Sequence, residues 1–200
     1  MGLALDYDEG QTPLSEEEKD GLLIPTVTTK GELDEVEQRN IETVIQWTLT
    51  RRKRFTIDEI LTENFIKEVH SKMLSSVWCW AGSFRNTEKN IGISRFRIGI
   101  ELKTLLDDCK YWIENETYSP DEIAIRFKHR IVSIHCFSNG NGRHSRLMAD
   151  IIIDKLFGGE VFTWGSRNLI QKGDYRKLYL KALQAADVGN YEPLIEFARS

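Results

Sequence analysis

Apolar residues recur every three or four positions along most of this chain, and that spacing predicts amphipathic helices. The clearest stripe runs from Leu102 to Ile113 with almost no polar interruption. Stripes of the same kind predict six further helices, near residues 33–49, 56–73, 119–134, 143–157, 174–187 and 191–198. Because no internal repeat or low-complexity tract interrupts the pattern, we expect one mainly α-helical domain.

Several helix ends carry recognisable capping residues. In Thr56-Ile57-Asp58-Glu59, Thr56 and Glu59 can each satisfy a backbone amide of the other, which is the capping-box pattern. The run Ser119-Pro120-Asp121-Glu122 supplies a capping serine, a proline at the first helical position and acids at the positive end of the helix dipole. Gly158-Gly159 predicts the end of the helix at 143–157.

Two stretches depart from the helical spacing. Residues 82–98 contain glycines and asparagines and alternate partly between apolar and polar positions, which predicts a short β-hairpin or flap. Residues 1–32 have no stable period, so we interpret them as an N-terminal arm with a short turn near Glu16–Leu23. The predicted organisation is therefore an arm at 1–32 and a helical domain at 33–200.

The composition is that of an ordinary globular protein of 200 residues, with 40% apolar and 29% charged side chains. Twenty-seven Lys and Arg against 31 Asp and Glu leave a net charge of −4, so no general electrostatic argument favours nucleic acid or a membrane surface. The basic cluster Arg51–Arg54 stands at the negative end of a predicted helix and needs no nucleic acid to explain it.

The expected location is the cytoplasm. No apolar stretch is long enough to cross a bilayer, and the N-terminus lacks the pattern of a signal peptide. Cys79, Cys109 and Cys136 are far apart and form no Cys-x-x-Cys pair, which is typical of reduced thiols.

The stretch from His135 to Arg146, with the sequence HCFSNGNGRHSR, joins two strongly predicted helices. Gly140-Asn141-Gly142 lies at the start of the second helix, where unpaired amides and the helix dipole favour a bound anion such as phosphate. The two glycines allow the backbone to approach that phosphate closely. Arg143 and Arg146 share one face of the helix and can hold a di- or triphosphate. Arginines at this end oppose the helix dipole, so a purely structural helix start seldom has them.

His135 ends the preceding helix, a few residues before this anion-binding loop. A neutral imidazole can take a proton from a hydroxyl that attacks a bound phosphate, so the segment predicts transfer to a hydroxyl. Each part has a simpler interpretation by itself. Gly-Asn-Gly is often only a turn, and a lone histidine such as His70 or His129 is more often a capping or core residue. We expect His144 to face solvent, and the histidine spacing does not indicate a zinc site.

This segment resembles the motif of the Fic family, His-x-Phe-x-Asp/Glu-Gly-Asn-Gly-Arg-x-x-Arg. Seven positions match: His135, Phe137, Gly140, Asn141, Gly142, Arg143 and Arg146. The run from Trp78 to Arg85 is also similar to the family. Four short segments resemble the bacterial Fic proteins called mobile mystery protein B, at 29–33, 37–41, 89–92 and 162–165. The resemblance covers nearly the whole chain and implies a Fic-type helical bundle with a short β-hairpin flap.

The resemblance also implies an activity, which is the transfer of AMP from ATP to a Ser, Thr or Tyr hydroxyl of a target protein. His135 would take the proton of that hydroxyl, and Phe137 would anchor the loop in the core. The flap at Thr87–Ile98 would bind the backbone of the target as an added strand. The implied catalytic residues are His135, Asn141 and Arg143. The implied nucleotide-binding residues are Ser138, Asn139, Gly140, Asn141, Gly142, Arg143 and Arg146.

Two positions depart from the family pattern. Asn139 stands where most members have an acid that binds Mg²⁺. An amide oxygen is still a hard ligand but has no charge, so we expect weaker metal binding or a larger role for the phosphates of the nucleotide. Cys136 stands where proline is common.

Many Fic proteins also carry a Ser/Thr-x-x-x-Glu-Gly/Asn helix whose glutamate bonds the second arginine of the motif and blocks the γ-phosphate. Thr28-x-x-x-Glu32 has the first half of that pattern, and Glu37 is another candidate partner for Arg146. Acids in the first turn of a helix are the simpler interpretation of both. Without an internal inhibitor, we expect a separate antitoxin-like partner.

Two other functions remain open at this point. The same site can support phosphoryl or another nucleotidyl transfer, because the orientation of the nucleotide decides which phosphorus is attacked. Alternatively, the protein is a catalytically weak nucleotide-binding interaction module, if Asn139 does not hold the metal.

Overall fold

The computed structural model describes residues 13–50, 54–166 and 172–200, and the α-helix is the dominant element in them. Arg51 to Lys53 of the basic cluster lie outside the described residues. The α-helices are α1 Glu16–Lys19, α2 Lys30–Ile45, α3 Ile57–Ile60, α4 Glu63–Leu74, α5 Ile98–Glu114, α6 Pro120–Ile134, α7 Asn141–Phe157, α8 Lys172–Asp187 and α9 Glu192–Arg199. A π-helix at Gln46–Thr50 continues α2, and a short 3-10 helix at Arg95–Arg97 precedes α5. The predicted mainly α fold is confirmed.

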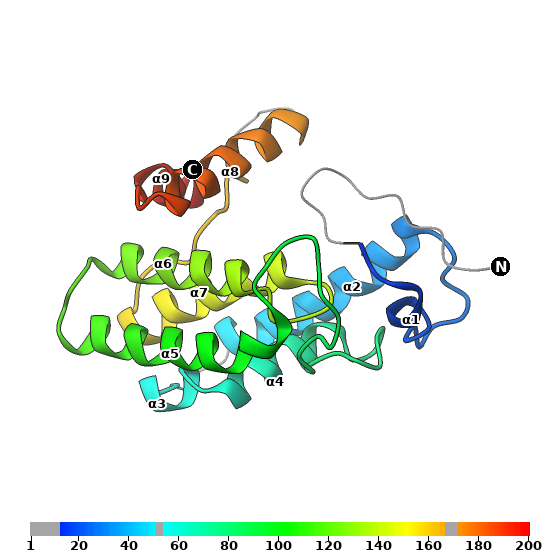
Figure 1. Ribbon diagram of the computed structural model, residues 1–200. Coiled ribbons are helices and arrows are strands. Elements are labelled where there is room, and N and C mark those ends of the chain that lie inside the picture. The colour runs from blue at the N-terminus through cyan, green and yellow to red at the C-terminus, as the bar shows by residue number, and fades with distance from the viewer. Residues whose placement is uncertain (1–12, 51–53, 167–171) are drawn as a thin grey trace.

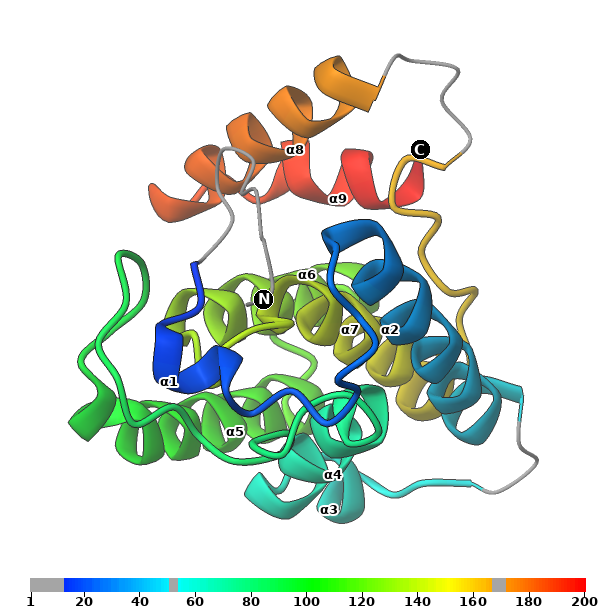
Figure 2. The same cartoon turned by 90° about the vertical axis from the view of Figure 1, so that its right-hand side faces the viewer.

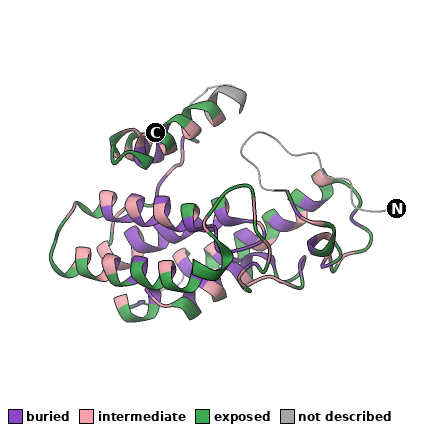
Figure 3. Ribbon diagram, in the orientation of Figure 1, coloured by how far each residue is buried: buried purple, intermediate pink, exposed green. Residues whose placement is uncertain are grey.

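The centre of the molecule is the pair α6 and α7, which run side by side and are joined by the loop at 135–140 (Figure 1). α5 packs against α6, and α2 and α4 pack against each other beside α7 (Figure 2). The inward faces of these helices carry the buried residues, whereas α5 exposes its outer face (Figure 3). α8 and α9 pack on each other, and α9 contacts α6. Among the described residues, no helix combines the length and the apolar character needed to cross a membrane.

The predicted caps place the ends of the two central helices. Ser119 caps α6 by accepting a hydrogen bond from the Glu122 N–H, at 3.3 Å. α6 ends at His135, which has left-handed backbone angles (φ 57°, ψ 60°). α7 begins after Gly140 (φ 76°) and ends at Gly158 (φ 65°), as its glycine predicts. The loop between the central helices therefore starts and ends with a left-handed residue, and it reverses the chain within six residues.

The helix predicted from Thr56 to Met73 is wrong in one respect, because it consists of two helices. The capping box is confirmed: the Glu59 N–H donates to Thr56 Oγ1 at 3.2 Å, and the Thr56 N–H donates to the Glu59 carboxylate at 2.8 Å. Leu61 then leaves the helical region (φ −89°, ψ 57°). Thr62 caps a new helix by accepting a hydrogen bond from the Phe65 N–H.

The predicted β-hairpin at 82–98 is also wrong, since this segment contains no strand. It forms a loop that projects beside the start of α5 (Figure 1). The buried Arg85 side chain bridges the loop by donating to the carbonyls of Thr87 and Ile93. Glu88 adds a second link, because its carboxylate accepts hydrogen bonds from the Ser94 hydroxyl and the Arg95 N–H, each at 3.2 Å. Side chains therefore hold the two limbs together, and the loop keeps its shape without a ladder of backbone hydrogen bonds.

Residues 13–23 pack against the segment that follows α4. The Leu23 N–H donates to the Val77 carbonyl at 2.8 Å, and the Cys79 N–H donates to the Gly21 carbonyl at 2.9 Å. These bonds flank an antiparallel bridge between Leu22 and Trp78. The N-terminal segment is thereby held next to the loop at 82–98, with α1 between that loop and α2 (Figure 2).

Candidate functional site

The candidate site lies where the C-terminus of α6 meets the N-terminus of α7. The loop that joins them contains Ser138 and Asn139, and the first turns of α7 contain Asn141, Gly142, Arg143 and Arg146. Gly140 is required at the turn, because an added Cβ would lie 2.9 Å from Leu74 Cδ1. At Gly142 an added Cβ would meet no described heavy atom within 4 Å, so the start of α7 is open on that side. The first amides of a helix have no partner within it.

The amide side chain of Asn141 holds the loop in shape. Its Oδ1 accepts a hydrogen bond from the Phe137 N–H at 3.0 Å, and its Nδ2 donates to the Phe137 carbonyl at 2.7 Å. Asn141 is buried, and so is Phe137. The polar groups of this side chain are therefore used inside the loop, and what Asn141 can offer a bound anion is its backbone amide.

His70 supports the loop from α4, a role that the sequence did not predict. Its ring stacks on Phe137 with centroids 3.7 Å apart. Nδ1 accepts a hydrogen bond from the Gly82 N–H at 2.9 Å, so Nε2 carries the proton and donates to the Asn139 carbonyl at 3.0 Å. Burial, with the neighbouring His144, lowers the pKa of His70 to about 3. The imidazole is neutral and links the loop at 82–98 to the loop at 135–140.

His144 is buried, so the prediction that it faces solvent is wrong. It lies on the face of α7 that packs on α4, where its Nε2 donates to the Ile66 carbonyl at 3.1 Å. Burial lowers the pKa of His144 to about 4. His144 is therefore a neutral core residue, as His70 is.

His135 lies at the C-terminal end of α6 and is only 5% exposed. Burial, followed by the Arg85 cation, lowers its pKa to about 4, against a hydrogen bond with the Val132 backbone that raises it. The imidazole is consequently neutral at pH 7, which is the state that a general base needs. Gly92 lies directly against it: a Cβ at Gly92, where φ is 97°, would be 2.5 Å from His135 Cβ.

The two arginines of the motif have different surroundings. Arg143 donates to Glu37 Oε2 at 2.5 Å, and the Trp78 indole donates to Glu37 Oε1 at 2.8 Å. Glu37 therefore pairs with Arg143, and not with Arg146 as one interpretation of the sequence allowed. The Arg146 side chain has no hydrogen bond or ion pair among the residues that the structure describes.

Glu32 does not reach either arginine. It caps α2 by accepting hydrogen bonds from the N–H groups of Thr28 and Thr29, at 2.9 and 3.0 Å. For this residue the simpler interpretation, an acid at the start of a helix, is confirmed.

Asp150 follows Arg146 by one helical turn. Burial raises the pKa of Asp150 to about 7, although hydrogen bonds from Trp164 and from the Phe162 N–H lower it. This carboxyl group ties the segment before α8 to the central helix. It is only partly ionised at neutral pH, so it compensates the Arg146 cation incompletely.

Asn139 offers a metal ion little. Its Oδ1 accepts a hydrogen bond from the Gly140 N–H at 2.5 Å, and this oxygen is neutral. Within residues 13–50, 54–166 and 172–200, no three His, Cys, Asp or Glu residues come together as a metal site. A divalent ion here would depend mainly on oxygens that a ligand brings.

Glu18 of α1 reaches the same region from the N-terminal segment. Its carboxylate accepts hydrogen bonds from the Thr87 hydroxyl at 2.8 Å and from Lys89, and it also bonds the Ser138 side chain. Glu18 and Lys89 are both 95% buried at their side chains. Burial would raise the pKa of Glu18, but the hydrogen bonds from Lys89, Ser15 and Thr87 lower it overall. The carboxylate thus stays charged and joins the flap segment to the loop at 135–140.

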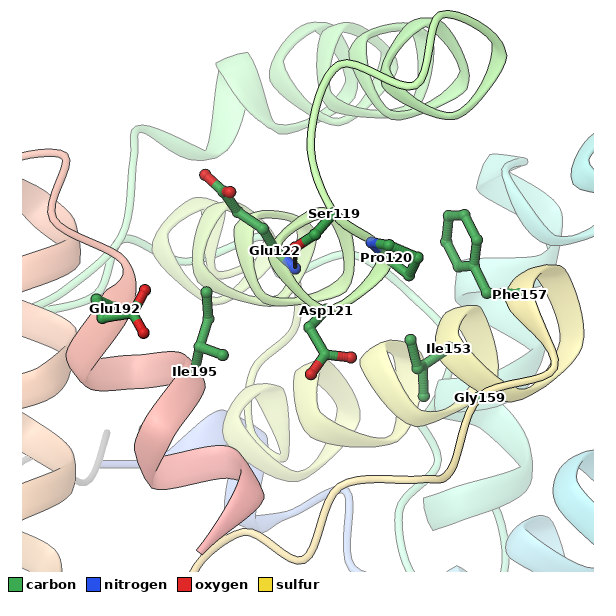
Figure 4. A pocket seen from close by; sticks show the side chains of 9 residues that line it. All are labelled: Ser119, Pro120, Asp121, Glu122, Ile153, Phe157, Gly159, Glu192 and Ile195. Atoms are coloured by element: carbon green, nitrogen blue, oxygen red, sulfur yellow. Dashed lines mark hydrogen bonds between the residues drawn. The ribbon is translucent and has the colours of Figure 1, made fainter.

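The described part of the chain also has a cavity of about 440 Å³ that lies away from the candidate site (Figure 4). It lies between the start of α6, the end of α7 and α9, and Asp121, Ile153 and Ile195 line it. Ile153 lies twelve residues after Asn141 in α7, so roughly 18 Å of helix separates this cavity from Asn141. None of its lining residues belongs to the segment from His135 to Arg146.

Comparisons with known proteins show which family the central part of the chain matches. Residues 60–153 match the model of the Fic/DOC family. The protein adenylyltransferase Fic of Aedes aegypti is 26% identical over 144 residues, which is 70% of this chain and 27% of that protein. The protein adenylyltransferase fic-1 of Caenorhabditis elegans is 26% identical over 148 residues, with the same coverage. The chain therefore spans about a quarter of the length of these curated relatives.

Solved structures show the same fold. The BepC protein of Bartonella tribocorum, a VirB-translocated effector with bound AMPPNP, has a TM-score of 0.64 at 17% identity, over 92% of this chain and 97% of that one. Residues 134–508 of C. elegans Fic-1 give a TM-score of 0.62 at 22% identity, over 90% of this chain and 51% of that one. The chain therefore contains a Fic/DOC-family region at residues 60–153, within a fold that Fic-domain structures share.

Proposed function

We propose that this protein is a protein adenylyltransferase, which transfers AMP from ATP to a hydroxyl group of another protein. One observation carries the proposal: the neutral imidazole of His135 and the open N-terminus of α7 lie at the two ends of one short loop. The adenylyltransferase names of the relatives support it, and so does the AMPPNP bound to BepC.

The phosphates of ATP would bind at the backbone amides of Asn141 and Gly142, where the helix dipole is positive. Arg143 and Arg146 would neutralise the β- and γ-phosphates through charge-assisted hydrogen bonds. Arg146 is available for this role, whereas Arg143 would exchange or share its bond with Glu37. Ser138 and Asn139 complete the loop that borders the nucleotide.

His135 would take the proton of the target hydroxyl as its oxygen attacks the α-phosphorus of ATP. The bond between that phosphorus and the oxygen that bridges to the β-phosphate breaks, AMP remains on the target, and pyrophosphate leaves. The pKa of His135, about 4, describes the site without nucleotide. Phosphate charge nearby favours the protonated imidazole, so bound ATP would raise this pKa and make the residue a stronger base.

Mg²⁺ would enter the site on the phosphates of ATP, and Asn139 Oδ1 would be its ligand from the loop. When bound, it would neutralise charge on those phosphates. The target would dock on the segment Thr87–Ile98. The backbone of this loop forms no strand of its own, which leaves backbone groups between Glu88 and Gly92 for a target backbone. An antitoxin-like partner would act by placing a carboxylate on Arg146.

The decisive experiment incubates the protein and a mixture of candidate target proteins with ATP labelled on either the α- or the γ-phosphate. Retention of the α label alone supports adenylyl transfer, and retention of the γ label alone indicates phosphoryl transfer. Retention of neither label contradicts both, and leaves a nucleotide-binding module if ATP still binds. His135→Ala should abolish transfer and leave ATP binding nearly intact, whereas loss of binding would contradict the role of His135 as base.

A further inference from the structure

Arg85 lies in the loop after α4 and is buried completely at its side chain. Three carbonyl groups accept hydrogen bonds from its guanidinium. Nε donates to the His135 carbonyl at 2.6 Å, Nη1 donates to the Thr87 carbonyl at 2.8 Å, and Nη2 donates to the Ile93 carbonyl. The backbone N–H of Arg85 donates to the Cys136 carbonyl at 2.9 Å. Arg85 thus bonds the end of α6 and also both limbs of the flap, one at Thr87 and the other at Ile93.

His135 needs such support because of its backbone. A left-handed conformation at a residue with a Cβ is strained and persists only where its surroundings enforce it. The last carbonyls of a helix also have no partner within the helix. Arg85 meets both needs, since it bonds the carbonyl of His135 with its side chain and the carbonyl of Cys136 with its backbone.

The flap is held by the same guanidinium. Between Thr87 and Ile93 the chain passes Gly92, which lies against His135 Cβ. The planar fork of an arginine presents donors along two edges and can bond carbonyls in different directions, which a lysine ammonium cannot do in the same fixed geometry. Arg85 therefore joins the flap to His135 beside the backbone bond from the Ile93 N–H to the Ile134 carbonyl, at 3.5 Å, and it is the side chain that bonds His135 itself.

We propose that Arg85 is a positioning residue for the transfer reaction, which sets the backbone of His135 and the place of the flap relative to it. The claim that Arg85 supports transfer rests on the proposed function. The claim that Arg85 holds His135 and the flap in place does not, and it can be tested without a substrate.

Charge gives this role a distinct signature. The charged groups that face His135 are Arg85 and Lys89, both from the loop at 82–98. Each cation has a carboxylate partner: Lys89 is paired with Glu18 of α1, and Arg85 Nη1 lies 3.6 Å from Glu88 Oε2. After burial, the Arg85 cation is the largest cause of the low pKa of His135. A residue that only fills space would leave this pKa unchanged when it is replaced by a neutral side chain.

The test uses Arg85→Gln, which removes the charge and the fork, and Arg85→Lys, which keeps the charge and loses the fork. Arg97→Gln is the control, because the Arg97 side chain is 66% exposed beside the same loop and pairs with Glu101. NMR titration of the His135 imidazole should show its pKa rising from about 4 toward its ordinary value in Arg85→Gln. The pKa should stay low in Arg85→Lys and in Arg97→Gln.

Amide hydrogen exchange over residues 87–93 measures how firmly Arg85 holds the flap in place. In both Arg85 variants these amides should exchange about tenfold faster or more, which is the effect expected for losing a charge-assisted hydrogen bond. In Arg97→Gln their exchange rates should stay unchanged. In transfer assays both Arg85 variants should lower kcat by about 10- to 100-fold with little change in KM for ATP. The acid limb of the pH profile should move to higher pH only in Arg85→Gln.

Unchanged exchange of the flap in Arg85→Lys, or an unchanged pKa of His135 in folded Arg85→Gln, would overturn the proposal. If Arg85→Gln does not fold, the exchange measurement on Arg85→Lys decides it. If the unmodified protein transfers no AMP, the proposed function fails while the titration and the exchange data still test the role of Arg85.

Discussion

Gly92→Ala should destabilise the protein because of where the new methyl group would lie. The substitution puts a Cβ at φ 97° and 2.5 Å from His135 Cβ. Holding an L-residue in the left-handed region costs about 1–2 kcal/mol. Forcing a methyl into a packed contact costs about 1–3 kcal/mol more. We therefore expect the free energy of unfolding to fall by about 2–5 kcal/mol, measured by urea unfolding followed through tryptophan fluorescence.

Gly189→Ala is the matched control. Gly189 has nearly the same backbone angle, φ 88°, but its added Cβ meets no described heavy atom within 4 Å. In Gly189→Ala the free energy of unfolding should fall only by the cost of the left-handed backbone, about 1–2 kcal/mol. The difference between the two variants isolates the contact of the flap with His135. Equal losses, with unchanged hydrogen exchange at residues 87–93, would refute the idea that the flap is packed on His135.

Three further predictions concern charge. Glu37→Gln should lower the free energy of unfolding by about 1–3 kcal/mol, because Arg143 loses its carboxylate while the Trp78 bond can persist; exposed Glu35→Gln should have no effect in the same urea titration. Asn139→Asp should strengthen the dependence of ATP binding on Mg²⁺ in calorimetric titrations, and an unchanged metal dependence would argue against a metal contact there. Acidification from pH 7 to pH 5 should destabilise the fold, since unfolding allows protonation of three histidines whose pKa values are lowered: His70, His135 and His144. On unfolding, Asp150 acts oppositely because its raised pKa falls and the group releases a proton. The free energy of unfolding should therefore fall by about 3 kcal/mol in total between pH 7 and pH 5, and a urea midpoint that is unchanged or higher at pH 5 would contradict this assignment.

Local signals in the sequence were enough for most helices and for the position of the loop. Ser119 and Gly158 mark helix ends through contacts with neighbours in the chain, and the periodic apolar positions select the buried faces. The loop at 135–140 could be placed because both flanking helices are strongly periodic. These features depend on residues only a few positions apart.

Other features depend on packing between distant segments. His144 and His70 are buried because α4 packs on α7, and no spacing rule indicates which polar residue such a contact will cover. Glu37 pairs with an arginine 106 positions away, and the competing partner Arg146 stands on the same helix. The partial alternation at 82–98 suggests strands, whereas the side chains of Arg85 and Glu88 supply the cross-links in place of a backbone ladder.

The family match begins at residue 60, but groups upstream of it complete the region around the loop. Glu37 neutralises Arg143 and accepts the bond of the Trp78 indole, and Glu18 neutralises Lys89. A transplant of residues 60–153 into another scaffold would carry two cations and an indole N–H without the carboxylates that they face. Grafting of this domain therefore has to include the segment from Pro13 to Ile45, so the unit that engineers can exchange is larger than the unit that sequence families share.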